Sequence, residues 1–334
     1  MVSYLRQIQI ATIAAIAIAI SAAISALSGA TSASAEPYPD HPLRMVIPFP
    51  AGGSNDIVGR AIAQGLAERL GKAVVVDNKP GAGGIIGTEA VAKAQPDGYT
   101  ILLISSTFTM NAAVQKQLPY DPATAFTPIT MLGRAPSVVT TTAKLPVATL
   151  ADLIALAKAK PGQLRLSSGG VGSYQHLVSE LFSRQSGTEF LIVQYKGGAP
   201  ALNDLIAGHV DVSIGTIIQT LPFIKEGQLK ALAVAGKKRL SALPDVPSTA
   251  EAGLPDYDAA NWWGLLAPSG TPTTIIERLH KETTDILDSA HLQRRFDAEG
   301  AEVVRMGPAE FAGYIATETA KWSKVVKDAN ITAE

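Results

Sequence analysis

Two glycine-rich segments, each lying between a short apolar run and a helical pattern, constrain the fold of this chain most strongly. Gly52 and Gly53 follow the apolar residues 43–48, and the glycines of segment 169–172 follow the apolar residues 164–168. A helical pattern comes directly after each segment. Short strands separated by helices predict right-handed βαβ units and a parallel sheet.

The same order of strand and helix continues along the chain and restarts after Pro136. Further strands are predicted at residues 73–77, 100–105, 137–142, 190–194, 210–215 and 229–235, and two amphipathic helices at 273–287 and 308–329. The chain has 334 residues, and the roughly 300 that follow residue 35 exceed what a single core usually holds, so we expect two domains. We place one lobe at residues 36–136 together with 260–334, and the other lobe at residues 137–259.

The first 35 residues are typical of a cleaved secretory signal peptide. Arg6 precedes an almost wholly apolar run at residues 8–27, and the small residues 33–35 provide a cleavage pattern. The alternative is an uncleaved membrane anchor, because the run is about long enough to span a bilayer. Ser21 and Ser25 interrupt the run, which favours cleavage. We therefore expect export and a location in the periplasm.

The composition excludes several classes of site. The chain has no cysteine, which rules out disulfides, thiol nucleophiles, cysteine-ligated metals and a lipid-attachment cysteine. We therefore expect a protein that no lipid tethers to a membrane. The formal net charge of −1 gives no basic footprint for nucleic acid, and the five histidines lack metal-ligand spacing. We expect no cofactor, no metal, no nucleic acid partner and a monomeric chain.

The two glycine-rich turns form the candidate binding site. Each turn directs backbone N–H groups to one place, where the dipole of the following helix favours negative charge. Both turns lie at the carboxyl ends of predicted strands, where open α/β sheets bind ligands. The site therefore suits a small carboxylate, and the alternative interpretation is a pair of tight turns without a ligand. The predicted ligand-binding residues are Phe49, Gly52, Gly53, Asp56, Ser105, Ser106, Gly170, Gly172, Ser173, His176 and Thr216.

An exported hydrolase or oxidoreductase on the same two-lobed scaffold is the alternative function, and three motifs argue against it. Segment 81–87 is similar to a dinucleotide-binding loop, but its third glycine comes one position late. Ser173 lacks the Gly-x-Ser-x-Gly context of a nucleophile, because Gln175 stands where the last glycine belongs. His176 falls in the first turn of a helix, whose dipole disfavours a charged ring. We expect this histidine to be neutral and predict no catalytic residue.

Several longer motifs resemble the Bug-type receptors of the tripartite tricarboxylate transporter family. They are residues 48–56, 78–84, 96–100, 170–176, 195–198, 243–248 and 263–268. The resemblance implies a two-lobed α/β solute-binding fold, type II-like, with the ligand between the lobes. It also implies that the two glycine-rich turns hold a carboxylate above Ser105 and Ser106, and that a membrane permease receives it. Signalling through a sensor kinase is an alternative use, and the identity of the acid stays open.

Overall fold

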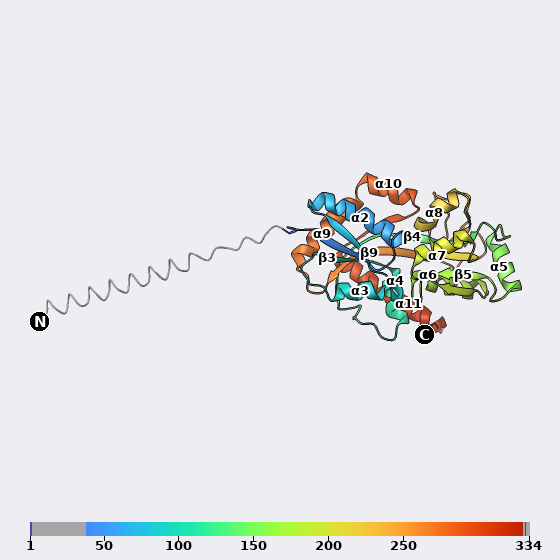
Figure 1. Ribbon diagram of the computed structural model, residues 1–334, viewed down its shortest axis with the longest axis horizontal. Coiled ribbons are helices and arrows are strands. Elements are labelled where there is room, and N and C mark those ends of the chain that lie inside the picture. The colour runs from blue at the N-terminus through green and yellow to red at the C-terminus, as the bar shows by residue number, and fades with distance from the viewer. Residues whose placement is uncertain (2–37, 330, 332–334) are drawn as a thin grey trace. The chain divides into compact units, whose positions relative to one another are not determined.

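One long strand, β4 (Phe126–Thr142), joins two sets of strands in the computed structural model of the protein (Figure 1). The structure describes residue Met1, residues 38–329 and residue Ile331. Contacts divide the chain into Met1–Asp40 and His41–Glu334, and all the helices and strands described below lie in the second unit. The predicted signal peptide, apart from Met1, falls outside the described residues.

The first set of strands combines the beginning and the end of the chain. β1 pairs in parallel with β2 and β3, whereas β9 pairs antiparallel with β3 and with the first part of β4. β10 also pairs antiparallel with β4. These strands are β1 (Leu43–Ile47), β2 (Val74–Asn78), β3 (Thr100–Ser105), β9 (Ala260–Pro268) and β10 (Glu302–Met306).

The second set comes from the middle of the chain. β5 pairs in parallel with β6 and β7, and the last part of β4 pairs antiparallel with β7 and β8. These strands are β5 (Arg165–Ser168), β6 (Leu191–Gln194), β7 (Val212–Thr216) and β8 (Leu229–Val234). The predicted two-lobed α/β fold is confirmed. The predicted parallel pairing is confirmed within each set, for β1, β2 and β3 and for β5, β6 and β7. β4 and β9 add antiparallel pairs that were not predicted.

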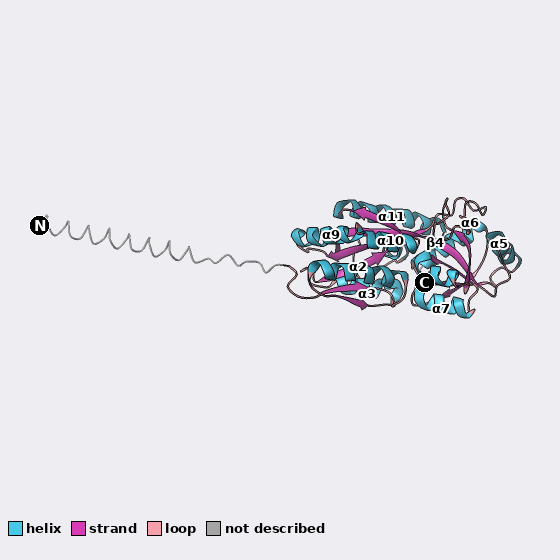
Figure 2. Ribbon diagram, turned by 90° about the horizontal axis from the view of Figure 1, so that it is seen from above, coloured by secondary structure: helices cyan, strands magenta, loops and turns pink. Residues whose placement is uncertain are grey.

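Helices pack on both sets of strands, and Figure 2 shows the strands lying among them. Those from the beginning and end of the chain are α2 (Ser54–Leu70), the 3-10 turn η1 (Ala82–Gly84), α3 (Ile85–Ala92), α4 (Ser106–Val114), α9 (Thr273–Leu287), α10 (Ala290–Ala298) and α11 (Pro308–Ala329). Those from the middle are α5 (Leu150–Ala159), α6 (Tyr174–Ser186), α7 (Gly198–Ala207) and α8 (Ile217–Lys225). Within the described residues, no helix combines the length and the apolar character that crossing a membrane requires.

Aromatic packing fixes strand β9 in the core of the first lobe, which is the lobe that contains the first set of strands. The Trp262 ring packs edge-on against Phe311 of α11 with ring centroids 5.7 Å apart, and both side chains are buried. Gly264 lies beside this pair. A Cβ at Gly264 would overlap the Phe311 ring and would lie 3.0 Å from the carbonyl oxygen of Thr130. The missing side chain of Gly264 therefore lets α11 approach the sheet.

We expect Gly264→Ala to lower the free energy of unfolding by about 1–3 kcal/mol, because a buried ring and a strand carbonyl must both move to admit one methyl group. Gly313→Ala is the matched control in α11, since a Cβ there meets nothing within 4 Å. That control should be neutral or raise the free energy of unfolding by about 0.5–1 kcal/mol, as alanine does in an exposed helix. Denaturant titration measures both values, and equal stability of the two variants would contradict this packing.

Candidate ligand-binding site

The carboxyl ends of β1, β3, β5 and β7 meet at one cleft between the two lobes. The cleft holds about 460 Å³ of space between its atoms, part of it open to solvent. From the first lobe it is lined by Phe49, Pro50, Gly53, Ser54, Asn55, Ser105, Thr107 and Asn261. From the second lobe it is lined by Gly169, Ser173, Tyr174, Gln175, Gly198, Thr216 and Gln219.

Five helices begin at this cleft. The first residue or the N-cap residue of α2, α4, α6, α7 and α8 is among the lining residues. Only in α6 does the side chain of the N-cap residue accept a hydrogen bond from the helix, from the His176 N–H to Ser173 Oγ at 3.2 Å. The other four helices therefore present N-terminal N–H groups that no N-cap side chain satisfies. Such helix ends attract an anion.

The helix ends favour an anion in the cleft without the help of charged side chains. Among the described residues that line it, none carries a formal charge. Its side chains supply hydroxyl and carboxamide groups instead, which donate hydrogen bonds without the desolvation penalty of a buried cation. The site can hold a carboxylate through neutral donors, in the way expected for the two glycine-rich turns.

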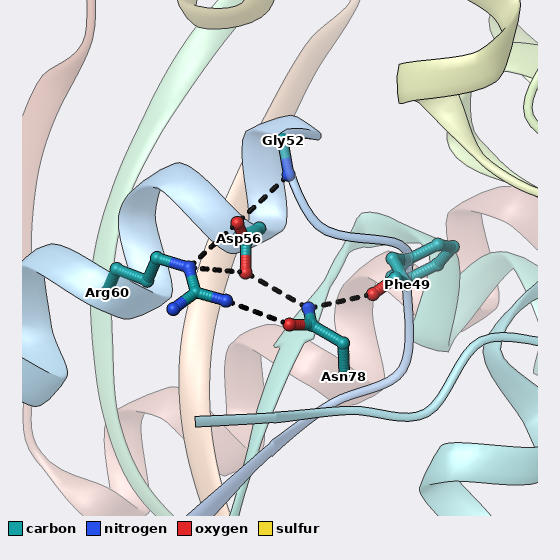
Figure 3. Close-up of polar contacts among 5 residues, drawn as sticks. All are labelled: Phe49, Gly52, Asp56, Arg60 and Asn78. Carbon is teal, nitrogen blue, oxygen red and sulfur yellow. Dashed lines mark hydrogen bonds and ion pairs between the residues drawn. The ribbon is translucent and has the colours of Figure 1, made fainter. Parts of the chain in front are cut away.

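The first turn, residues 48–56, owes its shape to the carboxylate of Asp56, as Figure 3 shows. The Gly52 N–H donates to Asp56 Oδ2 at 2.9 Å, and Arg60 Nε donates to both carboxylate oxygens at 2.9 Å. Asn78 Nδ2 donates to Asp56 Oδ1 and to the carbonyl oxygen of Phe49, each at 3.0 Å. Through these hydrogen bonds Asp56 links the turn to Arg60 of α2 and to Asn78 at the end of β2.

These hydrogen bonds favour the charged form of Asp56. Burial raises the pKa of Asp56, but hydrogen bonds from Arg60, Gly52 and Asn78 outweigh burial, and the pKa lies below its usual value of 3.8. A carboxyl group with a lowered pKa in the folded state stabilises the fold above its unfolded pKa, and that contribution is lost as the pH falls through the folded pKa.

The second turn, residues 169–176, depends on glycines in the left-handed region. Gly170 and Gly172 have φ values of 114° and 75°, which residues other than glycine rarely adopt. The Gly172 N–H donates to Nδ1 of His176 at 3.3 Å. Burial lowers the pKa of His176, in agreement with the expectation of a neutral ring. His176 thus shapes the turn and does not line the cleft.

Hydrogen bonds from the core fix the two asparagines that line the cleft. Trp263, which is fully buried, donates from Nε1 to Oδ1 of Asn55 at 2.7 Å. The Ser106 N–H donates to Oδ1 of Asn261 at 3.2 Å. The side-chain oxygen of each asparagine therefore already accepts a hydrogen bond, and the Nδ2 donors are the groups that these residues can offer to a ligand.

The two lobes touch at glycines that have no room for a side chain. A Cβ on Gly83 would lie 2.8 Å from the carbonyl oxygen of Val171, and a Cβ on Gly197 would lie 2.6 Å from Cδ of Pro50. The Tyr174 N–H donates to Oγ1 of Thr107 across the cleft at 3.0 Å. These contacts describe a closed arrangement of the lobes.

The structure brings some of the predicted ligand-binding residues into the cleft and places the others in supporting positions. Those that line the cleft are Phe49, Gly53, Ser105, Ser173 and Thr216. Those that do not are Gly52, Asp56, Ser106, Gly170, Gly172 and His176. The supporting residues shape the turns, and Ser106 Oγ accepts a hydrogen bond from the Trp262 N–H at 3.1 Å.

The sequence pattern did not predict several lining residues, among them Gln219 and Asn261. It also missed the turn before α7, although Gly197 and Gly198 form the same strand-to-helix pattern as the two turns that were predicted. Segment 81–87, interpreted as similar to a nucleotide loop, contributes Gly81–Ile85 to a second pocket of about 960 Å³. That pocket shares Phe49 and Gly169 with the cleft.

We expect Asp56→Asn to lower the free energy of unfolding at pH 7 by about 1–3 kcal/mol, because charge-assisted hydrogen bonds to Arg60 and Gly52 are weakened. The difference from the unsubstituted protein should shrink as the pH falls below the pKa of an unfolded aspartate, about 3.9, and through the lower pKa of folded Asp56. Urea titrations between pH 3 and pH 7 measure it. Asp245→Asn, at an exposed site, should show no such difference at any pH. A constant difference for Asp56→Asn would contradict the assigned network.

Comparisons with known proteins agree with this geometry. The model of the tripartite tricarboxylate transporter family receptor, TctC, matches residues 58–331. Protein BugT of Bordetella pertussis is 38% identical over 301 residues, which cover 90% of this chain and 92% of BugT.

Two solved structures have the same fold. R. palustris Rpa4515 with adipate gives a TM-score of 0.86 at 37% identity, covering 88% of this chain and 99% of that one. MatC from Rhodopseudomonas palustris with bound malate gives a TM-score of 0.83 at 31% identity, covering 86% of this chain and 100% of that one. The chain belongs to the receptors of the tripartite tricarboxylate transporter family.

Proposed function

We propose that this protein is an extracytoplasmic solute receptor that binds a small organic carboxylate and delivers it to the membrane permease of a tripartite tricarboxylate transporter. The observation that carries the proposal is the convergence of five helix N-termini on an uncharged cleft. N-terminal N–H groups that no N-cap side chain satisfies, together with hydroxyls, hold a carboxylate there without an arginine. The adipate and malate in the two solved relatives support this class of ligand.

In this proposal the carboxylate lies between the turns at residues 48–56 and 169–176. Phe49, Gly53 and Ser105 contact it from the first lobe, and Ser173 and Thr216 contact it from the second. The remaining predicted residues act through the turns: Gly52 and Asp56 fix the first, and Gly170, Gly172 and His176 fix the second. Ser106 acts by positioning Asn261.

We propose further that binding closes two lobes, residues 36–136 with 260–334 and residues 137–259. Supporting this, β4 exchanges its partner β9 for β7 and β8 between Pro136 and Ser137. The hinge then lies near residues 135–138 and 257–264. A ligand that contacts both lobes binds the closed state better than the open one, and this difference in affinity drives closure. With residues 1–35 as a cleaved signal, the receptor works in the periplasm.

The proposal includes the absence of turnover. The Ser173 Oγ accepts a hydrogen bond from the His176 N–H as the cap of α6. The His176 Nδ1 accepts a hydrogen bond from Gly172 within the turn. These partners favour a structural role for both side chains, and so favour a receptor over an exported hydrolase or oxidoreductase.

We expect Gly53→Leu to abolish carboxylate binding while the fold survives. Gly53 has an extended backbone, with φ −79° and ψ 167°, that leucine also adopts. A Cβ at Gly53 would meet only Pro50 O at 3.6 Å and Ala199 N at 3.9 Å, so the longer side chain occupies the cleft without straining the turn. Isothermal titration calorimetry with acids found in a thermal-shift screen measures the loss, because a ligand that binds only the folded state raises its melting temperature.

Gly313→Leu, on an exposed face of α11, is the control for adding a leucine and should bind as the unsubstituted protein does. Unchanged affinity of Gly53→Leu would contradict the position proposed for the ligand. A screen in which no carboxylate raises the melting temperature would contradict the proposed function itself.

A further inference from the structure

We infer that a groove behind the hinge controls how tightly this receptor holds its ligand, because the groove narrows when the ligand cleft widens. The inference rests on the lobe closure that the proposed function includes, and extends it to the balance between the open and closed states. Side chains that hold the walls of the groove apart favour the closed state. They therefore strengthen ligand binding without touching the ligand.

The groove is a space separate from the ligand cleft, and both lobes form its walls. It holds about 1010 Å³ of space between its atoms, part of it open to solvent. The first lobe contributes residues from segment 297–302, and the second lobe contributes residues from segment 235–241. Pro136 of β4 and Ala260 of β9 lie between these walls, at the hinge. The groove and the cleft share no lining residue.

The cleft and the groove lie on opposite faces of the two hinge strands. β4 and β9 run antiparallel, and Pro136 is opposite Ala260 in their pairing. Asn261 is the next residue of β9 and points to the other face, because successive residues of a strand alternate between faces. Pro136 and Ala260 line the groove, whereas Asn261 lines the cleft. A rotation about these strands that widens the cleft therefore brings the walls of the groove together.

Added bulk in the groove acts on the open state more than on the closed one. In the closed arrangement Ala260 is partly exposed at the floor of the groove, and the surrounding space accepts a larger side chain. As the walls approach each other, that side chain becomes overpacked, which costs free energy. The cost falls on the open state, so the population of the closed state rises and the apparent Kd falls in proportion.

Opposite charges on the two walls favour the open state in the unsubstituted protein. The wall from the first lobe carries Asp297, Glu302 and Arg134, and Arg134 Nε pairs with Glu302 Oε2 at 3.0 Å. The wall from the second lobe carries two exposed lysines, Lys237–Lys238, and Asp258. The net charge is thus negative on one wall and positive on the other. Opening of the cleft brings these charges closer together and strengthens their attraction.

Two tryptophan variants test the groove. Ala260→Trp adds bulk to its floor, and Ser241→Trp adds bulk to its exposed rim. The ligand is the acid that raises the melting temperature most among acetate, succinate, malate, adipate, citrate and benzoate. Calorimetry should show a Kd lower by roughly fivefold or more for each variant. Ala123→Trp is the control, exposed and outside both the groove and the cleft, and should leave Kd unchanged.

Charge reversal tests the same equilibrium without added bulk. Lys237→Glu combined with Lys238→Glu should lower Kd about twofold to fivefold, the scale of exposed ion pairs, because the walls then repel each other in the open state. Negative charge by itself repels an anionic ligand and raises Kd, so the sign of the effect is diagnostic. Asp297→Lys in the same chain should return Kd toward the unsubstituted value. Lys160→Glu, at the exposed end of α5, is the control and should not lower Kd.

Small-angle X-ray scattering of the ligand-free proteins separates this inference from the function on which it rests. Both tryptophan variants should have a smaller radius of gyration than the unsubstituted protein, which should itself contract when the acid binds. Unchanged scattering and unchanged Kd in these variants overturn the inference and leave carboxylate binding standing. If no acid binds, the proposed function fails, and the scattering of the ligand-free variants alone decides the inference. Thermal melting shows whether each variant is folded, and Ser241→Trp decides if Ala260→Trp is not.

Discussion

Both lobes depend on the backbone hydrogen bonds of a single strand. β4 runs for 17 residues and pairs with β9 and β10 in its first part and with β7 and β8 in its last part. The exchange occurs at Pro136, whose nitrogen carries no hydrogen and cannot donate to a ladder. A proline, which cannot donate a ladder hydrogen bond, therefore lies where one sheet ends and the other begins. Everything in the cleft, from the turns to the helix ends, is positioned relative to this strand.

The local elements of the fold and the parallel pairing of β1, β2 and β3 were accessible from the sequence, whereas the antiparallel pairing of β4 and β9 was not. The alternation of apolar strands and amphipathic helices located β3 and α9 at their observed bounds. It missed α4, because Ser105, Ser106 and Thr107 look like the end of a strand, and the helix that they begin is nearly all buried. It also missed the first part of β4, where Pro128 and Gly133 interrupt the pattern. Whether β9 pairs parallel or antiparallel depends on contacts between distant segments, which local patterns do not contain.

The candidate site, like the fold, could be predicted from the sequence only in part. Glycines between a strand and a helix indicate a turn that can bind an anion, and two such turns were predicted from their residues alone. Gln219 carries no such signal, since a glutamine in the first turn of a helix is ordinary until the fold buries it beside Gly198. Asp56 gives the opposite case. An acidic residue after a glycine-rich turn suggests a ligand contact, but three neighbouring donors occupy its carboxylate.

The contacts that flank the cleft also bear on how long a ligand stays bound. Gly83 meets the backbone of Val171, and Gly197 meets Pro50. These contacts bring the lobes together beside the cleft, which stays partly open to solvent. If a bound acid leaves only when the lobes part, its residence time is set by the rate of that opening motion, and acids of different affinity share it.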